Sequence, residues 1–221
     1  MTSAVLVTGA NRGIGLSLCK LYQSLGYQVY AACRQSSEAL DNLGVTIISG
    51  IDVIQEDAGY KLALALGGSK LDLLINNAGI LRNDVLGKLN RDQIRDQFET
   101  NALAPLMITE ALLNNLKEGS KIGIITSRMG SIEDNTSGGR YGYRMSKVAL
   151  NIAGKSLAQD LKPRGIALAM LHPGLVSTDM ISVRGDITPD EAAERLAHRL
   201  DLLDLTTTGT FWHSNGDVLP W

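Results

Sequence analysis

Cysteine, proline and aromatic residues are scarce in this sequence, and neither sign of charge is in large excess. The 221 residues include two cysteines and five prolines, and aromatic residues make up 5%. Cys19 and Cys33 lack the paired spacing of a disulfide framework or a metal site, so we expect no metal ion and assign neither cysteine a redox role. A formal net charge of -2 without a basic cluster gives no reason to expect a nucleic-acid partner.

Long apolar runs are also missing. Those present are too short and too often interrupted to cross a bilayer, so no membrane partner is expected. A strand pattern, Ala4–Val7, begins close to the N-terminus without a charged leader, which favours a cytoplasmic protein over an exported one. With 44% hydrophobic residues, the chain is long enough for one domain with a full core, over residues 1–221.

Short apolar runs alternate with helical patterns along the whole chain. The runs predict strands at residues 4–7, 28–33, 45–48, 71–75, 122–125, 166–171 and 208–212. The sequence contains no repeats and no low-complexity linker. Alternating strands and helices therefore predict an α/β fold, a doubly wound parallel sheet of about seven strands with helices on both faces.

The turn after the first strand is rich in glycine and opens a helix, with Gly9, Gly13 and Gly15 in sequence. Glycines let the backbone approach a pyrophosphate, and the helix N-terminus supplies amide donors. The spacing is G-x-x-x-G-x-G rather than the dinucleotide fingerprint G-x-G-x-x-G, and close packing alone would also explain the glycines. The turn favours a Rossmann-like domain that binds NAD(P).

Side chains after the next strands indicate which dinucleotide would bind. Arg34 ends the second strand, where an arginine suits the 2′-phosphate of NADP, and Arg12 could add a second charge, although both could be ordinary surface residues. Asp52 follows the third strand and could contact adenine, cap a helix over Ile54–Leu66, or both. The Asn76–Gly79 stretch ends the fourth strand as a cofactor contact or a plain turn.

A long helix is predicted to open with Asn90 and Gln93 as a capping pair and to run to about Leu116. Pro105 lies inside it and lacks an amide hydrogen, which leaves the carbonyl of Asn101 without its helical partner. That carbonyl could face a site, or the proline could provide a kink for packing.

Tyr143 and Lys147 lie four residues apart in the next helical pattern, which ends near Leu161, and so share one helix face. A nearby positive charge lowers the pKa of a phenol and makes it a usable acid or base. This spacing also occurs by chance, but Ser127 follows an apolar strand upstream of the same helix, so three polar groups could converge on one substrate oxygen. The polar loop Gly130–Arg140 lies beside this site, and residues 182–205, with Thr188 and Pro189 opening a helix, are the candidate substrate lid.

Taken together, these residues resemble the short-chain dehydrogenase/reductase superfamily over essentially the whole chain. The matching stretches, in the family's order, are Thr8–Gly15, Asp52, Asn76–Gly79, Asn101, Ser127, Tyr143, Lys147, Pro173 and Gly174. The segments 127–132, 141–147 and 211–221 look most like the carbonyl reductase branch described as Sniffer-like or C-factor-like. The interval between Ser127 and Tyr143 is longer than is usual in the family.

The resemblance implies a role for each matched residue. Tyr143 would be the acid/base, Ser127 would polarise the substrate oxygen, and Lys147 would bind the nicotinamide ribose and lower the tyrosine pKa. The Asn101 carbonyl would hold a water of the proton relay, and Thr178 would touch the carboxamide. The expected cofactor-binding residues are Gly9, Asn11, Arg12, Gly13, Ile14, Gly15, Arg34, Asp52, Val53, Asn77, Ala78, Gly79, Tyr143, Lys147, Pro173, Gly174, Val176 and Thr178.

We therefore expect an NADPH-dependent reductase of ketones or aldehydes that acts on a small molecule. Because members of the family often form dimers or tetramers, a homodimer or homotetramer is also expected. The main alternative is a non-catalytic dinucleotide-binding signalling or sensor protein on the same fold. Ser127 argues against it, because a pure binder has no use for that hydroxyl. A nucleotide-sugar epimerase would need a larger substrate region after Pro173 than the chain provides.

Overall fold

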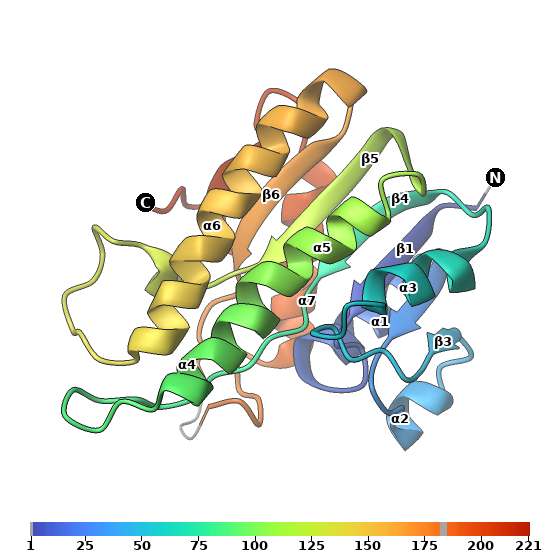
Figure 1. Cartoon of the computed structure of the whole chain (residues 1–221). Coiled ribbons are helices and arrows are strands. Elements are labelled where there is room, and N and C mark those ends of the chain that lie inside the picture. Colours follow the sequence, from blue (N-terminus) through green and yellow to red (C-terminus); the bar gives the residue numbers. More distant parts are fainter. Residues whose placement is uncertain (1, 182–184) are drawn as a thin grey trace.

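A seven-stranded parallel sheet, with helices on both faces, forms the framework of the computed structural model, which describes residues 2–181 and 185–221 (Figure 1). The strands are β1 (Ala4–Thr8), β2 (Gln28–Ala32), β3 (Thr46–Ile48), β4 (Leu71–Asn76), β5 (Leu116–Ile125), β6 (Ala167–His172) and β7 (Thr210–His213). Their order is β3-β2-β1-β4-β5-β6-β7, and every neighbouring pair is parallel. The predicted α/β doubly wound sheet is confirmed.

Two layers of helices cover this sheet. The helices are α1 (Gly13–Ser24), α2 (Glu38–Asp41), α3 (Ala58–Leu66), α4 (Arg91–Phe98), α5 (Ala104–Ala111), α6 (Tyr141–Leu161) and α7 (Pro189–Leu202). Helices α3, α5 and α6 contribute Leu62, Ile108 and Leu150 to one core cluster, while α1 and α7 contribute Leu18 and Leu196 to the other (Figure 1). No helix in the described part of the chain is long and apolar enough to span a bilayer.

The strands are buried because both faces of the sheet are covered. All five residues of β1 are buried, as expected for a central parallel strand that packs against helices on both sides. The chain moves from β1 to β2 and β3 on one side and then returns to β4 on the other. This reversal places a crevice at the carboxyl ends of β1 and β4, where open α/β sheets bind ligands.

The predicted helix from Asn90 to Leu116 is divided and ends earlier. Asn90 does cap α4, because its side chain accepts from the amides of Asp92 and Gln93 at 3.0 Å each. A π-helical segment, Glu99–Leu103, then separates α4 from α5, which ends at Ala111, while Leu116 already begins β5. A π turn accommodates one extra residue, so Pro105 enters α5 within its first turn instead of breaking a continuous helix.

Asp52 does not cap a helix, so that alternative was wrong. Helix α3 begins at Ala58 rather than Ile54, and no side chain caps its N-terminus. The intervening residues form turns instead, in which the main-chain carbonyl of Asp52 accepts from the amide of Gln55 at 3.0 Å.

The segment predicted as a substrate lid contains a helix that covers the sheet. Thr188 caps α7 by accepting from the amide of Glu191 at 3.2 Å, and Pro189 occupies its first turn, as predicted. However, Leu196 and Leu200 are 0% and 1% exposed and belong to the core cluster that α7 shares with α1. Residues 189–202 therefore pack on the sheet as one of its covering helices. Residues 182–184 lie outside the described residues, and the role of 182–205 as a substrate lid stays a prediction.

Helix α6 receives its N-terminal cap from a distant loop. Arg140 occupies the cap position without a side-chain cap of its own. Asp84 is 4% exposed, and its carboxylate accepts from the amide of Gly142 at 3.2 and 3.3 Å. The main-chain carbonyl of Asp84 accepts from the amide of Arg140 at 3.0 Å. A buried negative charge at a helix N-terminus is favourable. The loop after β4 therefore fixes where α6 begins.

Replacing Asp84 by Ala should lower the free energy of unfolding by about 1 to 3 kcal/mol, because it leaves a buried amide without its partner. Asn90→Ala is the matched control, since it removes an exposed cap and should cost about 0.5 to 2 kcal/mol. Urea denaturation measures both. A loss for Asp84→Ala no larger than for Asn90→Ala would show that Asp84 is an ordinary cap.

Leu196→Ala should destabilise the protein by about 2 to 5 kcal/mol, because it opens a cavity between α7 and the sheet. Leu202→Ala on the same helix is the control, since Leu202 is 56% exposed and should change stability by less than about 0.5 kcal/mol. Equal, small effects of both variants on the thermal midpoint would show that α7 does not depend on packing against the sheet and would support the predicted lid.

Candidate active site

Two adjoining cavities lie at the carboxyl edge of the sheet. The first has a volume of about 580 Å³ and is lined by the glycine turn after β1 and by residues that follow β2, β3 and β4. The second, of about 510 Å³, is lined by Ser127, Tyr143 and the turn after β6. Ile14, Thr178 and Met180 line both cavities, so a ligand could extend from one into the other.

Most of the predicted cofactor-binding residues line these cavities. Those in the first are Gly9, Asn11, Arg12, Gly13, Ile14, Gly15, Arg34, Asp52, Val53, Asn77, Ala78, Gly79 and Thr178. Those in the second include Tyr143, Pro173, Gly174 and Val176. Lys147 and Asn101 line neither cavity and lie just behind the surface, with exposed fractions of 4% and 0%.

The glycines of the first turn are required by close backbone contacts. Gly9 has a φ of +67°, and a Cβ there would lie 2.9 Å from the Cα of Ala78. A Cβ on Gly15 would lie 2.2 Å from the carbonyl oxygen of Gly9. The Asn77 side chain donates to the carbonyls of Thr8 and Gly9 at 2.9 and 3.2 Å. The predicted glycine turn therefore packs directly on the turn after β4, where no side chain would fit at Gly9 or Gly15.

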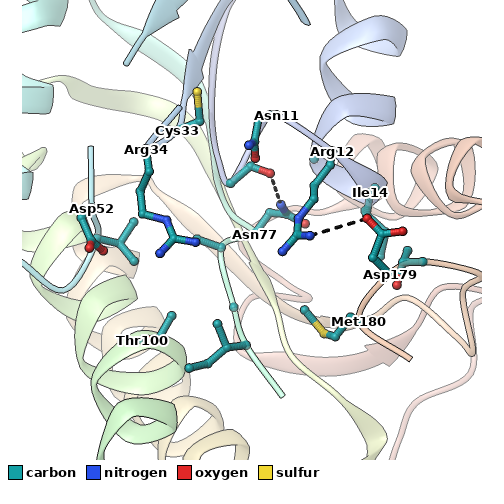
Figure 2. A pocket seen from close by; sticks show the side chains of 18 of the residues that line it. Asn11, Arg12, Ile14, Cys33, Arg34, Asp52, Asn77, Thr100, Asp179 and Met180 are labelled. Carbon is teal, nitrogen blue, oxygen red and sulfur yellow. Dashed lines mark hydrogen bonds and ion pairs between the residues drawn. The ribbon is translucent and has the colours of Figure 1, made fainter. Parts of the chain in front are cut away.

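Two arginines extend into the first cavity from opposite sides, and Figure 2 shows their guanidinium groups facing the same space. Arg12 is held by an ion pair with Asp179, at 3.5 Å between Nη1 and Oδ2. Arg34 enters no ion pair within the described residues, and Asp52 lines the same cavity (Figure 2). Cationic side chains beside a glycine turn and a helix N-terminus suit a dinucleotide with a phosphorylated ribose.

The predicted catalytic side chains come from β5 and α6. Ser127 follows β5 and is 8% exposed. Tyr143 and Lys147 are 8% and 4% exposed and lie one turn apart on α6, with the lysine Nζ 5.8 Å from the centroid of the tyrosine ring. The lysine ammonium donates to the carbonyl of Ile125 at 3.0 Å. The structure therefore brings the predicted serine, tyrosine and lysine to one place.

Burial controls the proton affinities of this group. It raises the pKa of Tyr143 above its ordinary value, while the Ser127 hydroxyl and the Arg140 guanidinium oppose that rise. Burial also lowers the pKa of Lys147 to about 7. Lys147 is not among the groups that oppose the rise of the tyrosine pKa, so the lowering expected from it stays a prediction.

Asn101 acts through its side chain. Its amide nitrogen donates to the carbonyl of Ile80 at 2.8 Å and to the hydroxyl of Ser146 at 3.0 Å, and its amide oxygen accepts from the Ile80 amide at 2.8 Å. Ser146 in turn donates to the carbonyl of Tyr143 at 2.8 Å. Asn101 thus connects the loop after β4 to the helix that carries Tyr143. The role expected for its main-chain carbonyl stays a prediction.

Sequence reasoning missed the charged side chains of the second cavity. Arg128, Asp134, Arg140 and Arg144 all line it, yet no motif marks them. Arg140 has φ and ψ angles of 50° and 46°, and it is the only residue other than glycine with a positive φ in the described part of the chain. This left-handed conformation costs an ordinary L-residue roughly 1 to 2 kcal/mol. Nothing in the sequence signals it, because Gly138 and Gly139, just before Arg140, are the residues expected to adopt such a conformation.

Comparisons with known proteins agree with this geometry. The short chain dehydrogenase family model matches residues 3–187. The 1-hydroxy-2-glutathionyl-2-methyl-3-butene dehydrogenase of Rhodococcus sp. (strain AD45) is 42% identical over 225 residues, which cover 99% of this chain and 100% of that protein.

Solved structures of carbonyl reductases are also similar over the full chain. The carbonyl reductase Sniffer of D. melanogaster is 32% identical with a TM-score of 0.93, and the alignment covers 100% of both chains. The NADPH-bound carbonyl reductase from chicken fatty liver is 31% identical with a TM-score of 0.89, covering 100% of this chain and 99% of that one. The resemblance found in the sequence is confirmed: the chain belongs to the short chain dehydrogenase family.

Proposed function

We propose that the protein is an NADPH-dependent oxidoreductase that reduces a ketone or aldehyde carbonyl to an alcohol. The observation that carries this proposal is the joint placement of Ser127 and Tyr143 on one cavity that adjoins the glycine-turn cavity. Two similar structures are carbonyl reductases, and one of them binds NADPH. NADPH, when bound, supplies the hydride for the carbonyl carbon.

Tyr143 serves as the proton donor. Because burial raises its pKa, the phenol is protonated near pH 7 and can donate to the substrate oxygen as charge develops there. The Ser127 hydroxyl donates a hydrogen bond to the same oxygen and orients it. In the reverse direction Tyr143 accepts the proton, and the Rhodococcus relative is named as a dehydrogenase of a hydroxy compound. Lys147, one turn away and just behind the cavity surface, would bind the nicotinamide ribose.

The remaining predicted residues are assigned to the cofactor. The turn of Gly9, Gly13 and Gly15 and the N-terminus of α1 would hold the pyrophosphate, and Thr178 would contact the carboxamide. Arg34 and Arg12 would bind the 2′-phosphate, and Arg12 would then share its charge between that phosphate and Asp179. The ion pair can adjust, because the side chains of Arg12 and Asp179 are 68% and 80% exposed.

A non-catalytic signalling or sensor role is not favoured. A protein that only binds a dinucleotide needs the first cavity but gains nothing from Ser127 and Tyr143 on the second. The intact catalytic group, and relatives named for oxidoreductase activities, both support an enzyme.

Assembly into a homodimer or homotetramer is a further part of this proposal. Phe98, Met107, Met145 and Ile152 on α4, α5 and α6 are 43%, 48%, 57% and 64% exposed, which supports an apolar contact along these helices. The cytoplasmic location stays a prediction from the sequence.

Tyr143→Phe should lower turnover by about 10²- to 10⁴-fold, because the phenyl ring keeps the packing but cannot donate a proton. Tyr141→Phe is the matched control and should be nearly as active as the wild type. Turnover is followed by NADPH absorbance with a panel of ketones and aldehydes, and cofactor affinity by fluorescence titration. Near-normal reduction by Tyr143→Phe would remove Tyr143 from the mechanism.

Arg34→Asp should weaken NADPH binding by roughly 10- to 100-fold and shift the preference toward NADH, because it replaces a charge-assisted hydrogen bond by repulsion. The effect should be larger at low ionic strength, since salt screens exposed charges. Arg91→Asp, on α4 and outside both cavities, controls for net charge. If the wild type bound both cofactors equally, or if Arg34→Asp kept its preference, the arginine would be ordinary surface charge.

A further inference from the structure

The cavity that holds Ser127 and Tyr143 has a positively charged wall. Among the described residues that line it, three are arginines, Arg128, Arg140 and Arg144, and Asp134 is the one carboxylate. His172 adds no charge near pH 7, because burial lowers its pKa to about 3. The lining therefore carries a formal charge of +2, from three arginines against one aspartate.

One of the arginines is already neutralised. The Nε and Nη2 atoms of Arg128 both donate to the carboxylate of Asp134, the latter at 3.3 Å. This fork leaves neither partner with a full charge to offer to a ligand. The excess positive charge therefore comes from Arg140 and Arg144.

These two guanidinium groups differ in how far they are engaged. Arg144 donates through Nε to the carbonyls of Gly138 and Gly139 at 3.3 and 3.2 Å, and through Nη2 to the hydroxyl of Ser137 at 2.8 Å. Arg140 contacts only a weak acceptor, the sulfur of Met129, at 3.7 Å. Neither enters an ion pair within the described residues. Arg140 thus keeps nearly all of its donors for a ligand.

The backbone at Arg140 supports a role beyond structure. A residue with a Cβ occupies a left-handed conformation there, directly after Gly138 and Gly139, which would adopt it without strain. Arg140 also lines the same cavity as Tyr143, and its guanidinium is one of two groups that oppose the effect of burial on the tyrosine pKa. A ligand bound at Arg140 would therefore share the cavity with the reacting group.

The rest of the wall is largely apolar. Leu81, Met129, Leu175, Met180 and Ile181 line the same cavity. A ligand that fits both parts has an apolar body and an anionic group.

We propose that Arg140, held in place beside Arg144, binds a carboxylate on the substrate, so that the protein prefers carbonyl compounds with an apolar body and a carboxylate over their uncharged analogues. This inference rests on the proposed reduction at Tyr143. Arg140 is accordingly a specificity-determining residue, and its planar guanidinium suits paired hydrogen bonds to a carboxylate.

The test compares 4-formylbenzoate with methyl 4-formylbenzoate, which place the same aldehyde opposite a charged or an uncharged group. The ratio of their kcat/KM values with NADPH is measured for the wild type, Arg140→Met, Arg140→Lys and the control Arg164→Met. Arg164 lies at the opposite edge of the sheet, before β6, so it controls for net charge. Binding of benzoate and benzamide to the NADP⁺-loaded protein, followed by calorimetry, provides a readout that needs no turnover.

The wild type should favour the acid, and Arg140→Met should lower the acid-to-ester ratio by about 10- to 100-fold and weaken benzoate binding alone. Arg140→Lys should retain part of the preference, and Arg164→Met all of it. An unchanged ratio in Arg140→Met would overturn the inference. So would an equal loss for both aldehydes, which would assign Arg140 to Tyr143 alone. Arg140-dependent benzoate binding without any aldehyde reduction by the wild type would instead overturn the proposed function.

Discussion

The site depends on a contact between two turns that follow different strands. The hydroxyl of Thr8 accepts from the amides of Asn77 and Ala78 at 3.0 and 3.1 Å, and the Asn77 side chain returns hydrogen bonds to the first turn. These bonds join the carboxyl ends of β1 and β4, the two strands between which the chain reverses direction. These contacts fix the glycine backbone and the N-terminus of α1 relative to the turn after β4.

The second requirement is that polar groups stay buried without losing their partners. Lys147 donates to a strand carbonyl, Asn101 is satisfied on both sides of its amide, and Asp84 accepts from the first turn of α6. Each of these side chains joins α6 to a different element, since Asn101 also donates to Ser146, and the contacts lie within the first two turns of the helix, where Tyr143 is. In a low-dielectric interior such contacts are strong, and each unmade one would be costly.

The sequence was sufficient to predict the sheet, the capped ends of α4 and α7, and the convergence of Ser127, Tyr143 and Lys147. Periodicity and capping are local signals, so they can be recognised without the fold. The sequence failed where tertiary packing decides. The charged face of α7 dominates the sequence pattern there, so the burial of Leu196 and Leu200 against the sheet was not predicted. The left-handed conformation of Arg140 could not be foreseen either, because no local signal in the sequence marks it.

The π-helical segment Glu99–Leu103 changes the direction in which side chains point before and after it, on α4 and α5. One extra residue in a turn rotates everything beyond it by about 100° relative to a continuous α-helix. Before the segment, Gln97 faces the loop after β4 and accepts from the amide of Arg82 at 2.8 Å. After it, Thr109 faces the sheet and accepts from the Asn76 side chain at 3.1 Å. The π-helical turn therefore lets α4 contact the loop after β4 beside the site, while α5 contacts the sheet.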